Sequence, residues 1–312
     1  ETVIALVLVG AGGLLIKGAV DRTKVVEPSS LVEEPETEPA TEPPTEFDPD
    51  RLIYTSVSVP SRSKYTGDLI LVNNDHQYFS TGSEELVSIN ALNAENGIDF
   101  FSAYAYDDVL GDYTILSQVY QPMVDMTRDY YNATGDDTLI IIGSYRTTEF
   151  QQSLYDADLA ATGEAESTRV AKAGFSEHET GLAFDYSEVI NYDFDGTGAE
   201  AWIAENCYKY GFILRYPDDK SSLTYIQFEP WHFRYVGAPH AYYMESNHLC
   251  LEEYIDLLRS CPYGTPLEIT DFDGAEYEVF YVPSSDGSDY TDIPVPSGYR
   301  YDISGNNVDG FI

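Results

Sequence analysis

The sequence has few basic residues. It contains 16 Lys and Arg against 54 Asp and Glu in 312 residues, which gives a formal net charge of -38 at pH 7. Nucleic acids and anionic membrane surfaces attract proteins through Lys and Arg, and they repel a surface this acidic. The composition therefore predicts no nucleic-acid partner and no electrostatic attachment to a membrane. A large net charge favours solubility, which accounts for most of the acidic excess.

Cysteine is scarce as well. Three cysteines cannot form a disulfide framework. Cys250 and Cys261 lie on either side of residues 251–259, where apolar residues recur at helical spacing. On one helix the two Cα atoms would be about 16 Å apart, whereas a disulfide requires them within roughly 7 Å. We therefore expect all three cysteines to be packed free thiols.

No apolar run reaches the ~20 residues that span a bilayer. Residues 2–16 are almost wholly apolar or glycine, and because the sequence starts with Glu rather than Met, we expect them to belong to a longer precursor. They are the remainder of an uncleaved anchor or the core of a signal peptide. No small-residue cleavage site follows closely, which favours a membrane anchor over residues 1–20.

Residues 21–50 have too few apolar side chains to fold. Proline and glutamate dominate this stretch, and such a composition cannot bury enough surface to offset the entropy of ordering the chain. We expect a disordered, extended spacer. An anchor, a spacer and then a globular domain is the layout of an enzyme held off the outer face of a membrane.

The rest of the chain has the composition of a folded protein. Hydrophobic residues make up 43% of the sequence and aromatic residues 14%, enough for a core. We expect one domain over residues 51–262. Residues 263–312 combine strand-like alternation with frequent Pro, Gly, Ser and Asp, which predicts a β-rich extension. The predicted strands are residues 69–74, 139–143, 182–186, 212–216 and 225–228, and the predicted helices are residues 122–131, 148–161 and 199–210.

Two short segments carry the residues that suggest chemistry. They are Ser176–Asp185 and Glu229–His232. A catalytic zinc site has three protein ligands and an open fourth position, and it needs a nearby carboxylate that is not a ligand to move a proton. His178, Asp185 and His232 fit the first requirement and Glu229 fits the second.

Local geometry can bring these side chains together. Gly181 allows a tight turn, after which a strand would point Asp185 back towards the turn. Glu229 and His232 are three residues apart, which on a regular strand places them on opposite faces. Pro230 cannot join a β-ladder, so it favours a bend that could direct both side chains to one site. A lone histidine is more often structural, and we assign that role to the other three, His76, His240 and His248.

The same segments carry a family resemblance. Residues 69–258 resemble the VanY-type D-alanyl-D-alanine carboxypeptidases, which are zinc peptidases of bacterial cell-wall peptides. The family pattern Ser-x-His-x-x-Gly-x-Ala-x-Asp is present without a gap, as are Glu-Pro-Trp-His and a characteristic Tyr-Gly-Phe-Ile-Leu-Arg-Tyr-Pro. A Ser-Gly-Tyr-Arg-Ser motif is altered to Gly-Ser-Tyr-Arg-Thr but keeps its arginine. The matching residues are Ser176, His178, Gly181, Ala183, Asp185, Glu229–His232, Tyr210–Pro217, Arg146 and Gln151.

The resemblance implies a fold and a set of roles. The fold would be α+β, with a small antiparallel sheet flanked by helices as in the hedgehog/DD-peptidase group. One zinc ion per chain would be bound by His178, Asp185 and His232, with Glu229 as the general base. Arg146 would bind the oxyanion or the terminal carboxylate of the substrate, because its planar guanidinium stays charged and pairs with carboxylate oxygens. Two further residues, Ser176 and Gln151, would hydrogen-bond the peptide, and Trp231 would form a subsite wall or pack in the core.

The resulting prediction is an anchored, extracytoplasmic zinc carboxypeptidase facing the bacterial cell wall. It would act as a monomer and remove the terminal D-alanine from peptidoglycan stem peptides. An L,D-carboxypeptidase, a D,D-dipeptidase or a peptidoglycan endopeptidase of the same fold remains an alternative. So does a non-catalytic protein that binds wall peptides, although the presence of Glu229 and of three ligand-type residues favours an enzyme.

Overall fold

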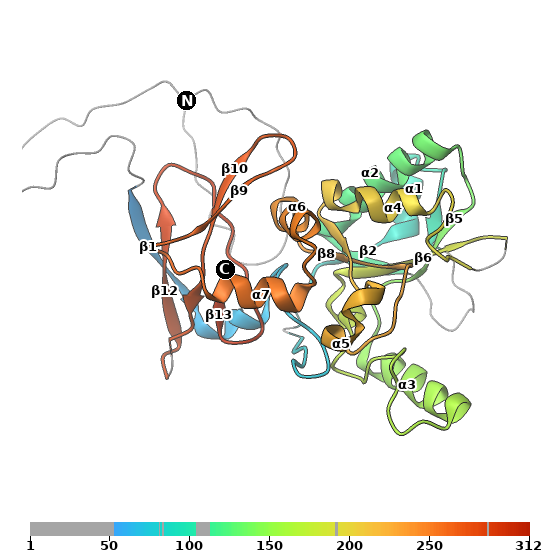
Figure 1. Ribbon diagram of the computed structural model, residues 1–312, viewed down its shortest axis with the longest axis horizontal. Coiled ribbons are helices and arrows are strands. Elements are labelled where there is room, and N and C mark those ends of the chain that lie inside the picture. The colour runs from blue at the N-terminus through green and yellow to red at the C-terminus, as the bar shows by residue number, and fades with distance from the viewer. Residues whose placement is uncertain (1–52, 81, 83, 104–112, 191–192, 286) are drawn as a thin grey trace, which may run out of the picture.

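A computed structural model describes residues 53–312 except 81, 83, 104–112, 191–192 and 286 (Figure 1). The predicted anchor (residues 1–20) and spacer (residues 21–50) lie outside the described residues. Within those described ranges, no helix combines the length and the apolar character needed to cross a membrane.

A five-stranded sheet forms the centre of the larger part of the molecule. Its strand order is β3-β5-β6-β8-β7, with β3 parallel to β5 and the other neighbours antiparallel. In Figure 1, α2 and α4 lie above this sheet and α3 and α5 lie below it. The predicted α+β class with a small, mainly antiparallel sheet and flanking helices is therefore confirmed. The strands are β3 (Ser102–Ala103), β5 (Leu139–Gly143), β6 (Ala183–Glu188), β7 (Phe212–Leu214) and β8 (His232–Tyr235).

Apolar side chains of α2 and α4 pack against the sheet. The longest helix is α2, whose buried residues include Met123 and Tyr130 and join Phe184 and Phe233 of the sheet in one core. The α-helices are α1 (Ile89–Asn96), α2 (Ser117–Thr134), α3 (Thr148–Thr162), α4 (Ala201–Asn206), α5 (Ser221–Thr224), α6 (Ala238–Asn247) and α7 (Leu251–Arg259). The 3-10 helices are η1 (Ser61–Tyr65), η2 (Glu177–Thr180), η3 (Cys207–Tyr210) and η4 (Asp218–Lys220).

The C-terminal region is built from short strands, as predicted. Strand β12 (Tyr290–Pro296) pairs antiparallel with β1 (Tyr54–Pro60), so the first and one of the last strands of the described chain form one ribbon. The domain boundary at residue 262 stays a prediction, and this pairing crosses it. The remaining strands are β9 (Leu267–Thr270) with β10 (Glu276–Val279), β11 (Val282–Pro283) with β13 (Gly310–Phe311), and β2 (Leu86–Ser88) with β4 (Thr114–Leu116).

Two predicted strands are wrong. Residues 69–72 are buried but form no strand, because Leu71 N donates to Asn306 O and the carbonyls of residues 68 and 70 accept from Arg234. Their backbone groups are therefore satisfied without a sheet neighbour. Residues 225–228 are also irregular, because α5 ends at Tyr225 in the left-handed conformation with φ of 61°.

The predicted helix at residues 199–210 is divided. Its first part is α4 and its second part is η3, after which Gly211 ends the turn with φ of 86°. All three cysteines are free thiols, as predicted, but only Cys207 and Cys250 are buried, whereas Cys261 is partly exposed. Cys250 immediately precedes α7 and Cys261 follows it.

Candidate metal centre

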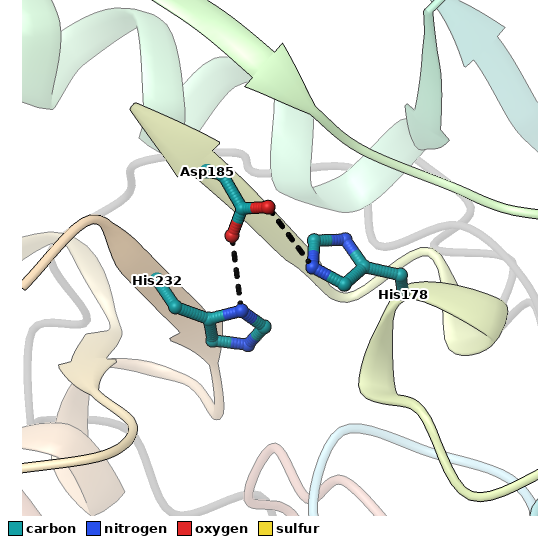
Figure 2. Close-up of side chains that lie close together, drawn as sticks. All are labelled: His178, Asp185 and His232. Atoms are coloured by element: carbon teal, nitrogen blue, oxygen red, sulfur yellow. Dashed lines mark ion pairs between the residues drawn. The ribbon is translucent and has the colours of Figure 1, made fainter. Parts of the chain in front are cut away.

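Two histidines and an aspartate meet at one end of the central sheet. His178 lies in η2, while Asp185 and His232 face each other across the β6–β8 pair. Asp185 Oδ2 is 3.2 Å from His178 Nε2, and Asp185 Oδ1 is 3.0 Å from His232 Nδ1 (Figure 2). One ligand-type atom from each of the three residues lies within 4.8 Å of the others, and all three side chains are buried.

His178 is held with Nε2 towards this group. Its Nδ1 lies 2.8 Å from the carbonyl oxygen of Ser144, which fixes the ring orientation. Burial, with the positive charge of Arg146 next, lowers the pKa of His178 to about 4. The imidazole is therefore neutral at pH 7, which is the form that binds a metal.

A glycine opposite Asp185 makes room for the carboxylate. Strand β5 carries an irregularity between Ile141 and Gly143, and Gly143 pairs with Asp185. A Cβ atom at Gly143 would collide with Asp185 Oδ2 and would lie 3.0 Å from Arg146 Nη2. Burial raises the pKa of Asp185, but His178 and His232 outweigh it and hold that pKa well below its usual range. The aspartate is therefore an anion.

The bend at Pro230 places Glu229 beside His232. His232 N donates to Glu229 O at 3.2 Å, which closes a turn, and Glu229 Oε2 lies 3.8 Å from His232 Nδ1. Both side chains thus face one site even though they are three residues apart. Burial raises the pKa of Glu229 to about 7. A carboxylate with that pKa can both accept and return a proton near neutral pH.

A cavity of about 490 Å³ opens over this group. It has the size of typical small-molecule sites. The eight residues singled out from the sequence all line it: Arg146, Gln151, Ser176, His178, Asp185, Glu229, Trp231 and His232. Its wall also includes Tyr216, whose ring centre is 4.9 Å from that of His232 and which we did not assign from the sequence.

Arg146 connects the metal-ligand residues to the rest of the cavity. Its Nη2 donates to Asp185 Oδ2 at 2.9 Å and its Nη1 to Gln151 Oε1 at 3.3 Å. Gln151 is buried and donates in turn to Ala171 O. Ser176 is also buried. Trp231 packs partly buried against the core and also lines the cavity, and its role as a subsite wall stays a prediction.

A buried ionic network behind the metal-ligand residues is not evident from the sequence. Glu177 accepts hydrogen bonds from Arg215 and Arg234, and Arg215 also pairs with Glu252. Both arginines are fully buried. The one sequence signal is that each arginine interrupts a run of apolar strand residues. That signal does not reveal which carboxylates they meet.

These residues fit a metal ion. Two histidines and one carboxylate are a common donor set for catalytic zinc. Ligand atoms about 2.0–2.1 Å from a tetrahedral zinc lie roughly 3.3 Å from one another, and one ligand-type atom from each of the three residues already lies within 4.8 Å of the others. Asp185 Oδ1, which lies 3.0 Å from His232 Nδ1, is buried and accepts no hydrogen bond from the described residues. A bound cation would satisfy it.

Comparison with known proteins identifies the family to which this chain belongs. The sequence profile of the VanY family, described as D-alanyl-D-alanine carboxypeptidase, matches residues 115–238. A D-alanyl-D-alanine carboxypeptidase from Enterococcus faecium is 34% identical over 255 residues, which is 82% of this chain and 77% of the relative. The chain belongs to the VanY family.

Other similar proteins extend the comparison. VanXYC from Enterococcus gallinarum, a bifunctional D-Ala-D-Ala dipeptidase and carboxypeptidase, is 39% identical over 135 residues, 40% of this chain and 71% of that protein. The crystal structure of the vancomycin-resistance D,D-dipeptidase VanXYg with a D-Ala-D-Ala phosphinate analogue is 30% identical, with a TM-score of 0.70. The match covers 83% of this chain and 97% of VanXYg. The family and fold predicted from the motifs are therefore confirmed.

Proposed function

We propose that the protein is a zinc-dependent D,D-carboxypeptidase that removes the C-terminal D-alanine from peptidoglycan stem peptides. Its family supports the substrate, and the donor set of His178, Asp185 and His232 supports the metal. The observation that carries the proposal is Glu229. It is a buried carboxylate outside the ligand set, 3.8 Å from a ligand histidine and in the same cavity. A peptide-binding protein without activity has no need of it.

The chain supplies proton transfer and charge stabilisation. His178, Asp185 and His232 would hold the zinc ion, which would supply Lewis-acid polarisation of water and of the scissile carbonyl. Glu229 accepts a proton from the attacking water as the new C–O bond forms. When the C–N bond breaks, Glu229 returns that proton to the leaving amine of D-alanine. A raised pKa of about 7 suits both steps.

Arg146 acts on the negative charges of the substrate. Its side chain lines the cavity and is held by Asp185 and Gln151. A guanidinium can stabilise the oxyanion that develops on the scissile carbonyl, or it can bind the terminal carboxylate. Ser176, Gln151 and Trp231 line the cavity beside it, and their position supports a role in contacting the peptide.

The site of action follows from the substrate. We infer that the enzyme works outside the cytoplasm, where stem peptides are exposed, with residues 1–20 as a membrane anchor and residues 21–50 as a spacer. The apolar run and the proline- and glutamate-rich composition of these segments support this layout. We also propose that it acts as a monomer, with residues 51–262 as the catalytic domain.

Mass spectrometry of purified muropeptides tests the proposal. The zinc-loaded protein should shorten pentapeptide stems by one alanine and leave tetrapeptide stems intact. Loss of a dipeptide would identify a D,D-dipeptidase, and shortening of tetrapeptides would identify an L,D-carboxypeptidase. Cleavage of cross-links would identify an endopeptidase. Binding without any cleavage would show a non-catalytic wall-binding protein.

A further inference from the structure

The His232 ring lies between two carboxylates on opposite sides. Its Nδ1 faces Asp185 in the metal-ligand group, whereas its Nε2 lies 3.5 Å from Glu177 Oε2. That separation is longer than a normal N–H···O hydrogen bond, which spans about 2.7–3.2 Å. His232 Nε2 and Glu177 Oε2 are both buried, and neither has a hydrogen-bond partner in the described part of the chain. Each atom is therefore the available partner of the other.

Glu177 is fixed as an anion by two arginines. Its Oε1 accepts from Arg215 Nε and from Arg234 Nη1, both at 2.7 Å, and none of these three side chains is exposed. Arg215 forms a bidentate pair with Glu252 at 2.7 and 2.9 Å. Arg234 donates further to the carbonyl oxygens of residues 68 and 70. Two carboxylates and two guanidiniums leave the network neutral, so Glu177 has no reason to move or to take up a proton.

A histidine that binds a metal through one nitrogen carries its proton on the other. A fixed acceptor on the second nitrogen selects that tautomer, orients the ring and strengthens its binding to the metal. Ser144 O does this for His178 through Nδ1. We propose that Glu177 does the same for His232: it is a positioning residue whose carboxylate accepts a hydrogen bond from Nε2–H in the metal-bound protein, so that Nδ1 faces the metal.

A purely structural role is the competing explanation. Glu177 also joins Arg234 of β8 to Arg215, which directly follows β7, so its loss would destabilise the fold even if His232 were unaffected. Glu252 provides a matched control because it also pairs with Arg215, from α7, and contacts neither histidine of the metal group in any interaction of the described residues. Glu177→Gln and Glu252→Gln each remove one negative charge from the same network, and only the first alters the acceptor for His232.

The test measures zinc affinity and stability separately on the full chain. Zinc dissociation constants are obtained by competition with a chromophoric chelator, and unfolding of the metal-free proteins by urea. Both variants should unfold at lower urea concentration than the unsubstituted protein. Glu177→Gln should weaken zinc binding by about 10–100-fold, the usual effect of losing such a partner, while Glu252→Gln should change it less than about threefold. Equal zinc affinity in the two variants would overturn the proposal.

The inference rests on the proposed zinc site, and the two can fail separately. Failure of the unsubstituted protein to bind zinc would remove the proposed function. Tight zinc binding that Glu177→Gln leaves unchanged would remove only this role. If Glu177→Gln does not fold, ¹⁵N NMR of histidines in the unsubstituted zinc-loaded protein decides instead. His232 should show a protonated Nε2 with a strongly downfield proton, and an unprotonated or metal-bound Nε2 would contradict the proposal.

Discussion

A zinc site with three protein ligands has none to spare. His178→Ala should therefore lose most of its zinc, since it removes one of three donors that the structure gathers within 4.8 Å. Elemental analysis after dialysis measures this directly. His76→Ala is the control, because His76 lies in a turn and does not line the cavity. Full zinc occupancy in His178→Ala would show that the ligand set is wrong.

Glu229 is predicted to act in turnover and not in metal binding. Glu229→Gln keeps the shape of the side chain and can hydrogen-bond water, but it cannot accept a proton. Turnover of a D-Ala-D-Ala-terminated peptide should fall by about 10²–10⁴-fold with zinc still bound, the range for loss of general acid–base catalysis. Near-normal rates in a zinc-loaded variant would remove Glu229 from the mechanism and favour a peptide-binding role.

The sequence identified the individual residues that line the site, but it did not identify the residues that hold them in place. The motifs identify eight side chains, and all of them line one cavity. Glu177 stands beside His178 in the same motif, yet nothing in the pattern shows that it meets Arg215 and Arg234, 38 and 57 residues away. Such contacts depend on how β7 and β8 pair. That pairing is a property of the folded sheet.

At the scale of secondary-structure elements, β5 has to leave space for the Asp185 side chain of β6. Gly143→Ala would put a Cβ atom against Asp185 Oδ2 at the point where the two strands pair. Displacement of the carboxylate should weaken zinc binding at least about tenfold, as expected when the orientation of a ligand is disturbed. Gly264→Ala is a suitable control, because a Cβ atom there meets nothing within 4 Å. Zinc affinities of the two variants are compared by chelator competition.

Elements with local signals were predicted well. Strand β5 and helix α3 match the predicted ranges closely, because an unbroken apolar run and a glycine after the last helical turn are sufficient signals. The prediction of a strand from the apolar residues 69–72 was wrong. These residues are buried, but their backbone hydrogen-bond partners are the C-terminal segment and Arg234 and not a neighbouring strand. An apolar run in a sequence predicts burial. It does not show whether a neighbouring strand or a side chain provides the hydrogen-bond partners of the backbone.

For the whole molecule, the N-terminal segment should be dispensable for chemistry. The cavity and the residues proposed to act in it all lie between residues 146 and 232. A protein lacking residues 1–50 should therefore cleave a soluble pentapeptide at the rate of the full chain, within about twofold, while its action on intact cells falls. A large loss on the soluble peptide would show that the folded domain begins earlier than residue 51.

The pairing of β1 with β12 determines when this protein can finish folding. Tyr54 is opposite Pro296, and the backbone at residue 71 is bound by Asn306 and Asn307. A ribosome makes these partners long after β1, so the growing chain carries an unpaired strand edge until they emerge. Chains that stop early cannot cover that edge. Such truncated chains also lack the C-terminal contacts that hold residues 68–71 beside Arg234. They should therefore be recognised and degraded as unfolded protein.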